Sequence, residues 1–121
     1  MEASTIRKGK QLVSFIELRQ YEIFPGKMND WVSLMEEEIV PFQTSKGMNI
    51  LGRYRGEDDD SKYVWLREFE SEEQRKSLYE AVYESDHWKN NLLPRVSKLI
   101  NRETIEVTRL IPLASSQHAK S

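Results

Sequence analysis

Three polar side chains alternate along the first apolar segment of the chain, and their types suit the recognition of an anion or the movement of a proton. Glu17, Arg19 and Tyr21 are spaced two residues apart, so in a β-strand they share one face. A guanidinium group can hold a carboxylate or polarise a carbonyl, and a phenol can donate a proton. Arg67 occurs in a second β-rich segment. We expect Arg19 and Arg67 to act as a pair, with Tyr21 as a proton donor.

Aromatic side chains and one histidine complete the set of candidate site residues. Rings on neighbouring strands could form the wall of a pocket for a flat ligand. His87 could serve as a general base, because imidazole titrates near neutral pH. The candidate catalytic residues are Arg19, Tyr21, Arg67 and His87, and the candidate ligand-binding residues are Glu17, Tyr54, Tyr63, Trp65 and Trp88.

Each of these residues also has a purely structural interpretation. Glu17 could neutralise Arg19 in an ion pair, since an unpaired buried charge is costly. The aromatic rings could pack the core or an interface without any ligand, and Trp88 could anchor its helix. Asp86 would not orient His87, because consecutive residues on a helix point about 100° apart. His87 could therefore be a solvated residue at the start of a helix.

The composition excludes several other kinds of site. The 121 residues include no cysteine and two histidines, which argues against thiolate chemistry and against a zinc centre. Lys and Arg number 18 against 20 Asp and Glu, so no surface for nucleic acid is expected. No apolar run approaches the ~20 residues of a membrane helix. We expect a cytoplasmic protein that uses no metal or cofactor, binds no nucleic acid and does not insert into membranes.

Hydrophobic periodicity predicts the elements that position the candidate residues. The Pro25-Gly26 step ends the first strand, and helical spacing then runs from Met28 to Phe42. Pro41 should kink or end that helix near its last turn. Ser71 and Gln74 form a capping box for a second helix, and Ser85 can cap a third. The strands are predicted at 14–24, 48–56, 62–70 and 103–112.

The order of these elements is β-α-β-β-α-α-β, which predicts a ferredoxin-like α+β fold with a four-stranded antiparallel sheet. Helices would cover one face of that sheet. The chain length suits a single domain, which we place at 13–113. It would lie between a flexible lead at 1–12 and a flexible tail at 114–121.

The strand alternation also predicts which residues share a face of the sheet. We expect the aromatic and arginine set on the face without helices, and the aliphatic set against the helices. Since so many exposed rings would form a large apolar patch, we expect a homodimer in which a second sheet closes over them and encloses a cavity. The first set is Phe15, Glu17, Arg19, Tyr21, Ile23, Tyr63, Trp65, Arg67 and Phe69, and the second is Ile16, Leu18, Val64 and Leu66.

Along 15–112 the sequence resembles the NIPSNAP family, through several short motifs in the same order. They are Glu17-Leu18-Arg19-x-Tyr21, Pro25-Gly26-Lys27, Glu36-Glu37-Glu38 before Pro41, Tyr63-Val64-Trp65-Leu66 with Phe69-Glu70-Ser71, Tyr83-x-Ser85-x-x-Trp88, and Ile111-Pro112. The resemblance implies a dimeric α/β barrel. Relatives of that barrel include monooxygenases, haem-degrading enzymes and small isomerases or dehydratases. No shared catalytic set comes with it.

Two functions are compatible with this sequence. The first is the binding of a small, partly hydrophobic metabolite in the barrel cavity, with or without a cofactor-independent reaction of the monooxygenase, dehydratase or isomerase type. The alternative is a non-catalytic dimeric adaptor that recruits a partner protein. A cavity of about a few hundred Å³ rimmed by Arg and Tyr would favour the first. A filled interior with an apolar patch on the outer helices would favour the second.

Overall fold

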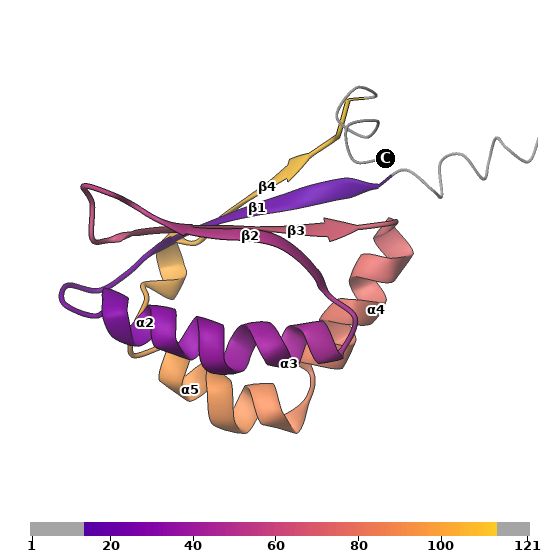
Figure 1. The fold of residues 1–121 in the computed structure, drawn as a ribbon. Helices are drawn as coiled ribbons and strands as arrows, with labels where there is room; N and C mark the ends of the chain where they lie inside the picture. Colours follow the sequence, from indigo (N-terminus) through magenta and orange to yellow (C-terminus); the bar gives the residue numbers. More distant parts are fainter. Residues whose placement is uncertain (1–13, 114–121) are drawn as a thin grey trace, which may run out of the picture.

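A four-stranded antiparallel sheet forms one layer of the protein, and the helices form the other. The computed structural model describes residues 14–113, and Figure 1 shows the helices gathered below the sheet. The strands are β1 (Phe15–Glu22), β2 (Asn49–Arg55), β3 (Lys62–Phe69) and β4 (Glu106–Leu110), in the spatial order β2-β3-β1-β4. The predicted ferredoxin-like α+β fold is therefore confirmed. The predicted lead at 1–12 and tail at 114–121 lie outside the described residues.

The first helix follows a tight turn and contains a proline. Gly26 has a positive φ of 76°, which a glycine adopts without strain. Helix α2 (Met28–Leu34) passes into a π-helical turn, η2 (Met35–Ile39), and then into α3 (Val40–Ser45). Pro41 was expected to kink or end the helix, but the chain stays helical to Ser45. The wider π turn ends at Ile39, two residues before Pro41, where a proline would otherwise crowd the preceding turn.

In the second half of the chain, two helical segments begin at predicted capping residues, Ser71 and Ser85. The Ser71 hydroxyl accepts a hydrogen bond from the Gln74 amide at 3.1 Å, which begins α4 (Glu72–Tyr83). The Ser85 hydroxyl accepts one from the Trp88 amide at 3.2 Å. The π turn η3 (Trp88–Leu92) and α5 (Leu93–Val96) follow. A 3₁₀ turn, η4 (Arg102–Thr104), comes next, so β4 begins later than predicted.

The assignment of the two faces of the sheet was wrong. The residues of β1 and β3 pair as predicted, with Glu17 opposite Arg67 and Tyr21 opposite Tyr63. However, this aromatic and arginine set is buried beneath the helices, and Trp65 and Arg67 are 2% and 0% exposed. The large rings bury more area there, and helix side chains supply hydrogen-bond partners for the arginines. The aliphatic set that includes Leu18 takes the opposite, helix-free face.

This reversal changes where a ligand site can lie. The polar and aromatic side chains converge inside one chain, between the sheet and its own helices, and not between two sheets of a dimer. Within residues 14–113, no helix is long and apolar enough to cross a membrane.

Candidate functional site

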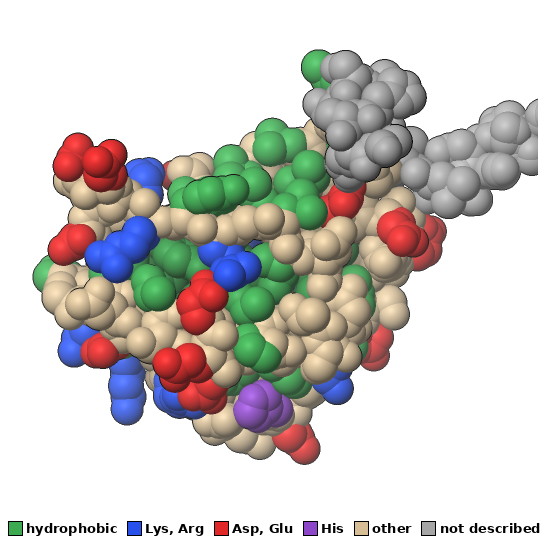
Figure 2. All heavy atoms as spheres, viewed as in Figure 1, with side chains coloured by type: hydrophobic (Ala, Val, Ile, Leu, Met, Phe, Trp, Pro, Cys, Tyr) green, Lys and Arg blue, Asp and Glu red, His purple; other side chains and the backbone are tan. Residues whose placement is uncertain are grey.

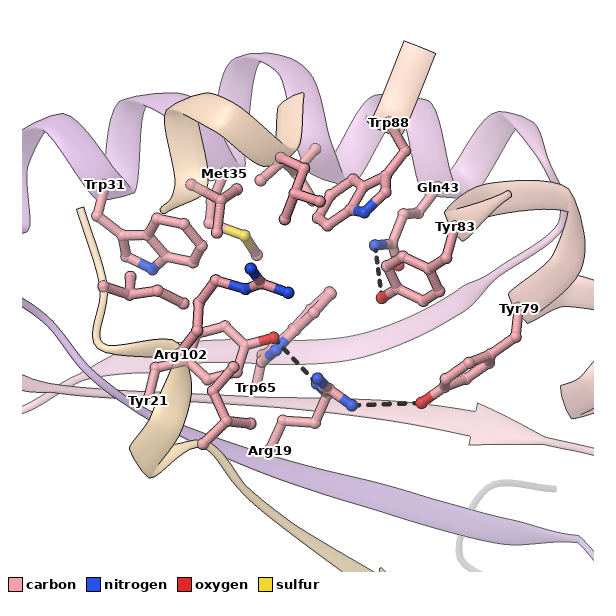
Figure 3. Close-up of a pocket in the computed structure, with 15 residues that line it drawn as sticks. Arg19, Tyr21, Trp31, Met35, Gln43, Trp65, Tyr79, Tyr83, Trp88 and Arg102 are labelled. Carbon is pink, nitrogen blue, oxygen red and sulfur yellow. Dashed lines mark hydrogen bonds between the residues drawn. The ribbon is translucent and has the colours of Figure 1, made fainter. Parts of the chain in front are cut away.

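A cavity of about 350 Å³ lies between the inner face of the sheet and the helices (Figure 3). The sheet supplies its floor, α2, η2 and α3 supply one wall, and α4, η3, α5 and η4 supply the rest. The lining is mostly apolar and aromatic, with two arginines. It consists of Arg19, Tyr21, Trp31, Met35, Ile39, Gln43, Trp65, Tyr79, Tyr83, Trp88, Leu93, Val96, Ile100, Arg102 and Ile105.

A buried ion pair lies beside this cavity and ties the sheet to the helices. Arg67 Nη2 donates to Glu17 Oε1 at 2.8 Å, across the β1–β3 pairing. Arg67 Nη1 donates to Gln43 Oε1 at 2.8 Å and to the Tyr83 hydroxyl at 2.9 Å. Because Gln43 belongs to α3 and Tyr83 to α4, these bonds hold both helices against the sheet.

Tyr79 links this ion pair to the cavity floor. Its hydroxyl lies 2.8 Å and 2.7 Å from the two carboxylate oxygens of Glu17 and donates to that carboxylate. It also accepts a hydrogen bond from Arg19 Nη1 at 3.2 Å. Burial and the bond to Glu17 raise the pKa of Tyr79 to about 12, although the nearby guanidinium groups oppose the rise. Tyr79 therefore remains a neutral phenol at neutral pH.

The buried charges do not cancel within this cluster. Glu17 is the one carboxylate, and it lies 2.8 Å from Arg67 Nη2 and 3.6 Å from Arg19 Nη1. Burial alone would raise the pKa of Glu17, but the Arg67 charge, the Tyr79 hydrogen bond and Arg19 together hold it below its ordinary value. Two guanidinium groups against one carboxylate leave the cluster with a net charge of +1.

Arg19 and Tyr21 are held in one arrangement at the cavity floor. Arg19 Nε donates to the Tyr21 hydroxyl oxygen at 2.9 Å, and the Arg19 side chain is 15% exposed. The same hydroxyl still carries its own proton, which it can donate to a ligand. Together the two side chains offer a cation and a phenol proton to the same part of the cavity.

Two indole nitrogens at the cavity have no hydrogen-bond partner within the described residues. Trp31 Nε1 and Trp65 Nε1 are buried donors without an acceptor, and both side chains line the cavity. Most buried donors are paired, because an unpaired one forfeits its hydrogen bonds to water. These two nitrogens are therefore unpaired donors in the side chains that line the cavity.

Four of the nine predicted site residues line this cavity: Arg19, Tyr21, Trp65 and Trp88. Glu17 and Arg67 lie directly behind the wall, where Arg67 has no exposed surface. Arg67 was predicted to hold a ligand, but in this structure it is enclosed and pairs with Glu17.

The other three predicted residues lie away from the cavity lining. Tyr63 is buried, but it packs against Tyr21 and Trp31. Tyr54 is 57% exposed on the helix-free face, because a bulge between Ile50 and Gly52 shifts the register of β2.

His87 is exposed on the outer surface of the helical layer. Its ring packs on Phe42, with the ring centres 4.7 Å apart, and Nδ1 lies 3.3 Å from Asn91 Nδ2. The predicted base is therefore on the far side of the helices from the substrate-sized space. Of the two residues predicted to move a proton, Tyr21 lines the cavity and His87 does not.

Several cavity residues were not predicted from the sequence. Tyr79 and Tyr83 lie four residues apart on α4, a spacing that puts them on one helix face and could have indicated a polar seam. Arg102 comes from the 3₁₀ turn, where no periodic pattern marks it. No cluster of three or more His, Asp or Glu side chains suited to a metal ion occurs between residues 14 and 113.

The fold and the site together define a class of protein: a ferredoxin-like α+β domain with a cavity under its helices. Within that class the chain belongs to the NIPSNAP family, whose family model matches residues 16–116.

Solved structures of other family members have the same fold. A NIPSNAP family protein from Agrobacterium tumefaciens is 26% identical, with a TM-score of 0.75 over 85% of this chain and 96% of that one. A second protein from that bacterium, described as a NIPSNAP family protein with unknown function, is 22% identical with a TM-score of 0.74, over 84% and 89% of the two chains. An uncharacterized NIPSNAP-like domain protein from Burkholderia xenovorans is 17% identical with a TM-score of 0.76, over 85% and 88%. No curated protein matches the chain.

Proposed function

We propose that the protein binds a small, partly hydrophobic metabolite in the cavity between its sheet and its helices. The cavity of about 350 Å³ supports this proposal most strongly, since its size lies within the range of small-molecule sites. Its lining also has the usual composition of such sites, in which apolar and aromatic walls surround a few fixed polar groups. Here those groups are Arg19 and Tyr21.

The same groups suit a reaction that needs no cofactor. The Arg19 charge would stabilise an oxyanion as it forms, in a space partly shielded from water. The Tyr21 hydroxyl, oriented by Arg19, would donate a proton to the developing anion. A dehydratase or an isomerase could use this pair, and the family relationship alone selects neither.

Replacing Arg19 by methionine is expected to release the metabolite. Native mass spectrometry of protein purified from its own host should detect a retained small ligand in the wild type and a loss of at least tenfold in its occupancy in R19M. Arg19→Met leaves Glu17 and Arg67 as a matched pair, 2.8 Å apart, so the fold should persist.

Arg53→Met is the control for this experiment. Arg53 pairs with Glu36 on the outside of the protein and does not line the cavity, so its variant should retain the ligand. An unliganded wild-type protein, or equal retention by R19M, would contradict a role for the cavity in binding.

We also propose that the protein is a homodimer formed through its helix-free sheet face. Figure 2 shows hydrophobic side chains gathered over the sheet, on the side away from the helices. This open sheet face consists of Ile16, Leu18, Leu51, Tyr54, Val64, Leu66 and Leu110. Leu51 and Tyr54 are 45% and 57% exposed, and apolar patches of this kind mark interfaces. A second copy would present the same face, as a two-fold contact requires.

Leu66→Asp should convert that dimer into a folded monomer. Leu66 pairs with Leu18 across the β1–β3 ladder, at the middle of the open sheet face, and a carboxylate there would be buried without a partner in a dimer. Sedimentation should show half the wild-type mass, with an unchanged circular dichroism spectrum. Ala81→Asp, on the exposed side of α4, should leave the mass at the wild-type value. A wild type that is already monomeric at micromolar concentration would contradict the proposal.

A further inference from the structure

The cavity carries positive charge and no acidic side chain. Arg19 and Arg102 line it, and no Asp or Glu within residues 14–113 does. The buried cluster behind its floor already has two guanidinium groups for one carboxylate. Arg19 is largely buried, whereas Arg102 is exposed to solvent. An anionic ligand would compensate this charge excess most directly.

Arg102 reaches into the cavity from its own anchored turn. Figure 3 shows its side chain extending into the middle of the space, above Tyr21. The guanidinium group makes no hydrogen bond or ion pair with any residue between 14 and 113. The turn that carries it is fixed to the end of β1, because the Asn101 amide donates to the Glu22 carbonyl at 2.8 Å and the Thr104 hydroxyl donates to the Glu22 carboxylate at 3.0 Å.

Hydrogen-bond donors also outnumber free acceptors at this site. The indole nitrogens of Trp31 and Trp65 have no acceptor within the described residues, and Arg102 adds further unpaired donors. A carboxylate accepts only, with about four lone-pair positions on its two oxygens. It pairs with guanidinium groups in a bidentate manner. The surrounding aromatic and aliphatic walls suit a flat apolar body next to that acceptor.

We propose that the cavity binds a small aromatic carboxylate, with its anionic group between Arg19 and Arg102 and its ring among the tryptophans. This assignment deepens the proposed function, on which it rests, by giving the chemical class of the ligand. Arg102 acts as the recognition residue, since its side chain extends from η4 into the cavity. The volume suits a body of few rings, and the mainly apolar lining disfavours a free phosphate.

Calorimetric titration of the 121-residue protein with matched probes tests this assignment. 2-Naphthoate and 2-naphthamide share their rings and differ in charge, and benzoate offers a smaller carboxylate. The wild type should bind one of the carboxylates at least tenfold more tightly than 2-naphthamide, since hydrogen bonds to a charged group are the stronger kind. Inorganic phosphate is the fourth probe and should bind more weakly than either carboxylate.

Variants of Arg102 separate recognition from folding. Arg102→Gln should weaken carboxylate binding about tenfold and leave amide binding unchanged, while R102K, which retains the charge without the planar fork, should give an intermediate value. Arg55→Gln is the control, because Arg55 is exposed on β2 and pairs with Asp60. It should bind as the wild type does.

The outcomes distinguish this inference from the proposed function. Equal affinity for the carboxylate and the amide, tighter binding of phosphate, or unchanged carboxylate binding by R102Q would each overturn the anion assignment. A neutral metabolite retained by host-purified protein would overturn it too, yet would uphold the proposed cavity function. No binding of any probe at millimolar concentration, with no retained metabolite, would overturn both.

Discussion

Glu17→Gln is expected to lower the free energy of unfolding by about 3–5 kcal/mol, because it breaks a buried ion pair and leaves its partners uncompensated. Arg67 is fully buried, and its bond of 2.8 Å to Glu17 would lose the negative charge of the acceptor. Arg19 and Arg67 would then face each other across a neutral amide. For a domain of this size the loss corresponds to a fall in Tm of roughly 12–20 °C, measurable by calorimetry or by circular dichroism.

The pH dependence identifies charge as the cause of this loss. The folded protein holds the pKa of Glu17 below its ordinary value of 4.5. Its contribution to stability is therefore fully present above about pH 4.5 and disappears as the pH falls through the lower, folded-state pKa. The difference in stability between the wild type and E17Q should stay constant from pH 7 to about pH 5 and shrink in more acidic solution.

A surface substitution and a double variant serve as controls for E17Q. Glu72→Gln makes the same chemical change in an exposed carboxylate that pairs with Arg75 and Arg109, and it should leave Tm near the wild-type value. Arg67→Met alone should also destabilise, whereas E17Q combined with R67M should cost less than the sum of the two single variants. Additive losses would contradict a direct interaction between the two charges.

Trp31→Ala is expected to destabilise the protein by about 3–5 kcal/mol, through the cavity that it would leave in the core. Trp31 is 1% exposed and packs edge-on against Tyr21 and Tyr63, with ring centres 5.6 Å and 5.7 Å away. It anchors α2 to the inner face of the sheet at this point. Chemical denaturation at a fixed pH, with the midpoint and the slope fitted separately, measures the loss.

Trp31→Phe separates ring packing from the indole nitrogen. It retains an aromatic ring and removes an N–H group that has no partner within the described residues, so its loss should be well below that of W31A. A loss equal to that of W31A would mean that the nitrogen has an acceptor in solution. In that event W31F should also lose any metabolite retained by the wild type.

Much of the architecture was predictable because it rests on local patterns. Period-two alternation located the strands, and the capping residues Ser71 and Ser85 located two helix starts. The grouping of Glu17 with Arg67 on one face also followed from alternation. The π turns before Pro41 and Pro94 carried no such pattern. They arise where a continuous helix must accommodate a proline.

The sequence did not predict which face of the sheet packs against the helices. Alternation shows which residues share a face, but both faces show the same period of two. Both groups contain apolar side chains. The choice depends on partners far along the chain: Gln43, Tyr79 and Tyr83 accept hydrogen bonds from the two terminal nitrogens of Arg67. In their absence the buried arginine would be too costly, so the correct face depends on contacts that no single segment contains.

The sequence by itself determined the family, the fold and the alternation that places Glu17, Arg19 and Tyr21 on one strand face, since these depend on local spacing. Only the tertiary structure decided that this face lies under the helices, and that the cavity therefore forms within one chain. It also decided that Arg102 joins Arg19 there, although 83 residues separate them. The physical reason is that burial and charge balance depend on tertiary contacts between side chains that are far apart in the sequence.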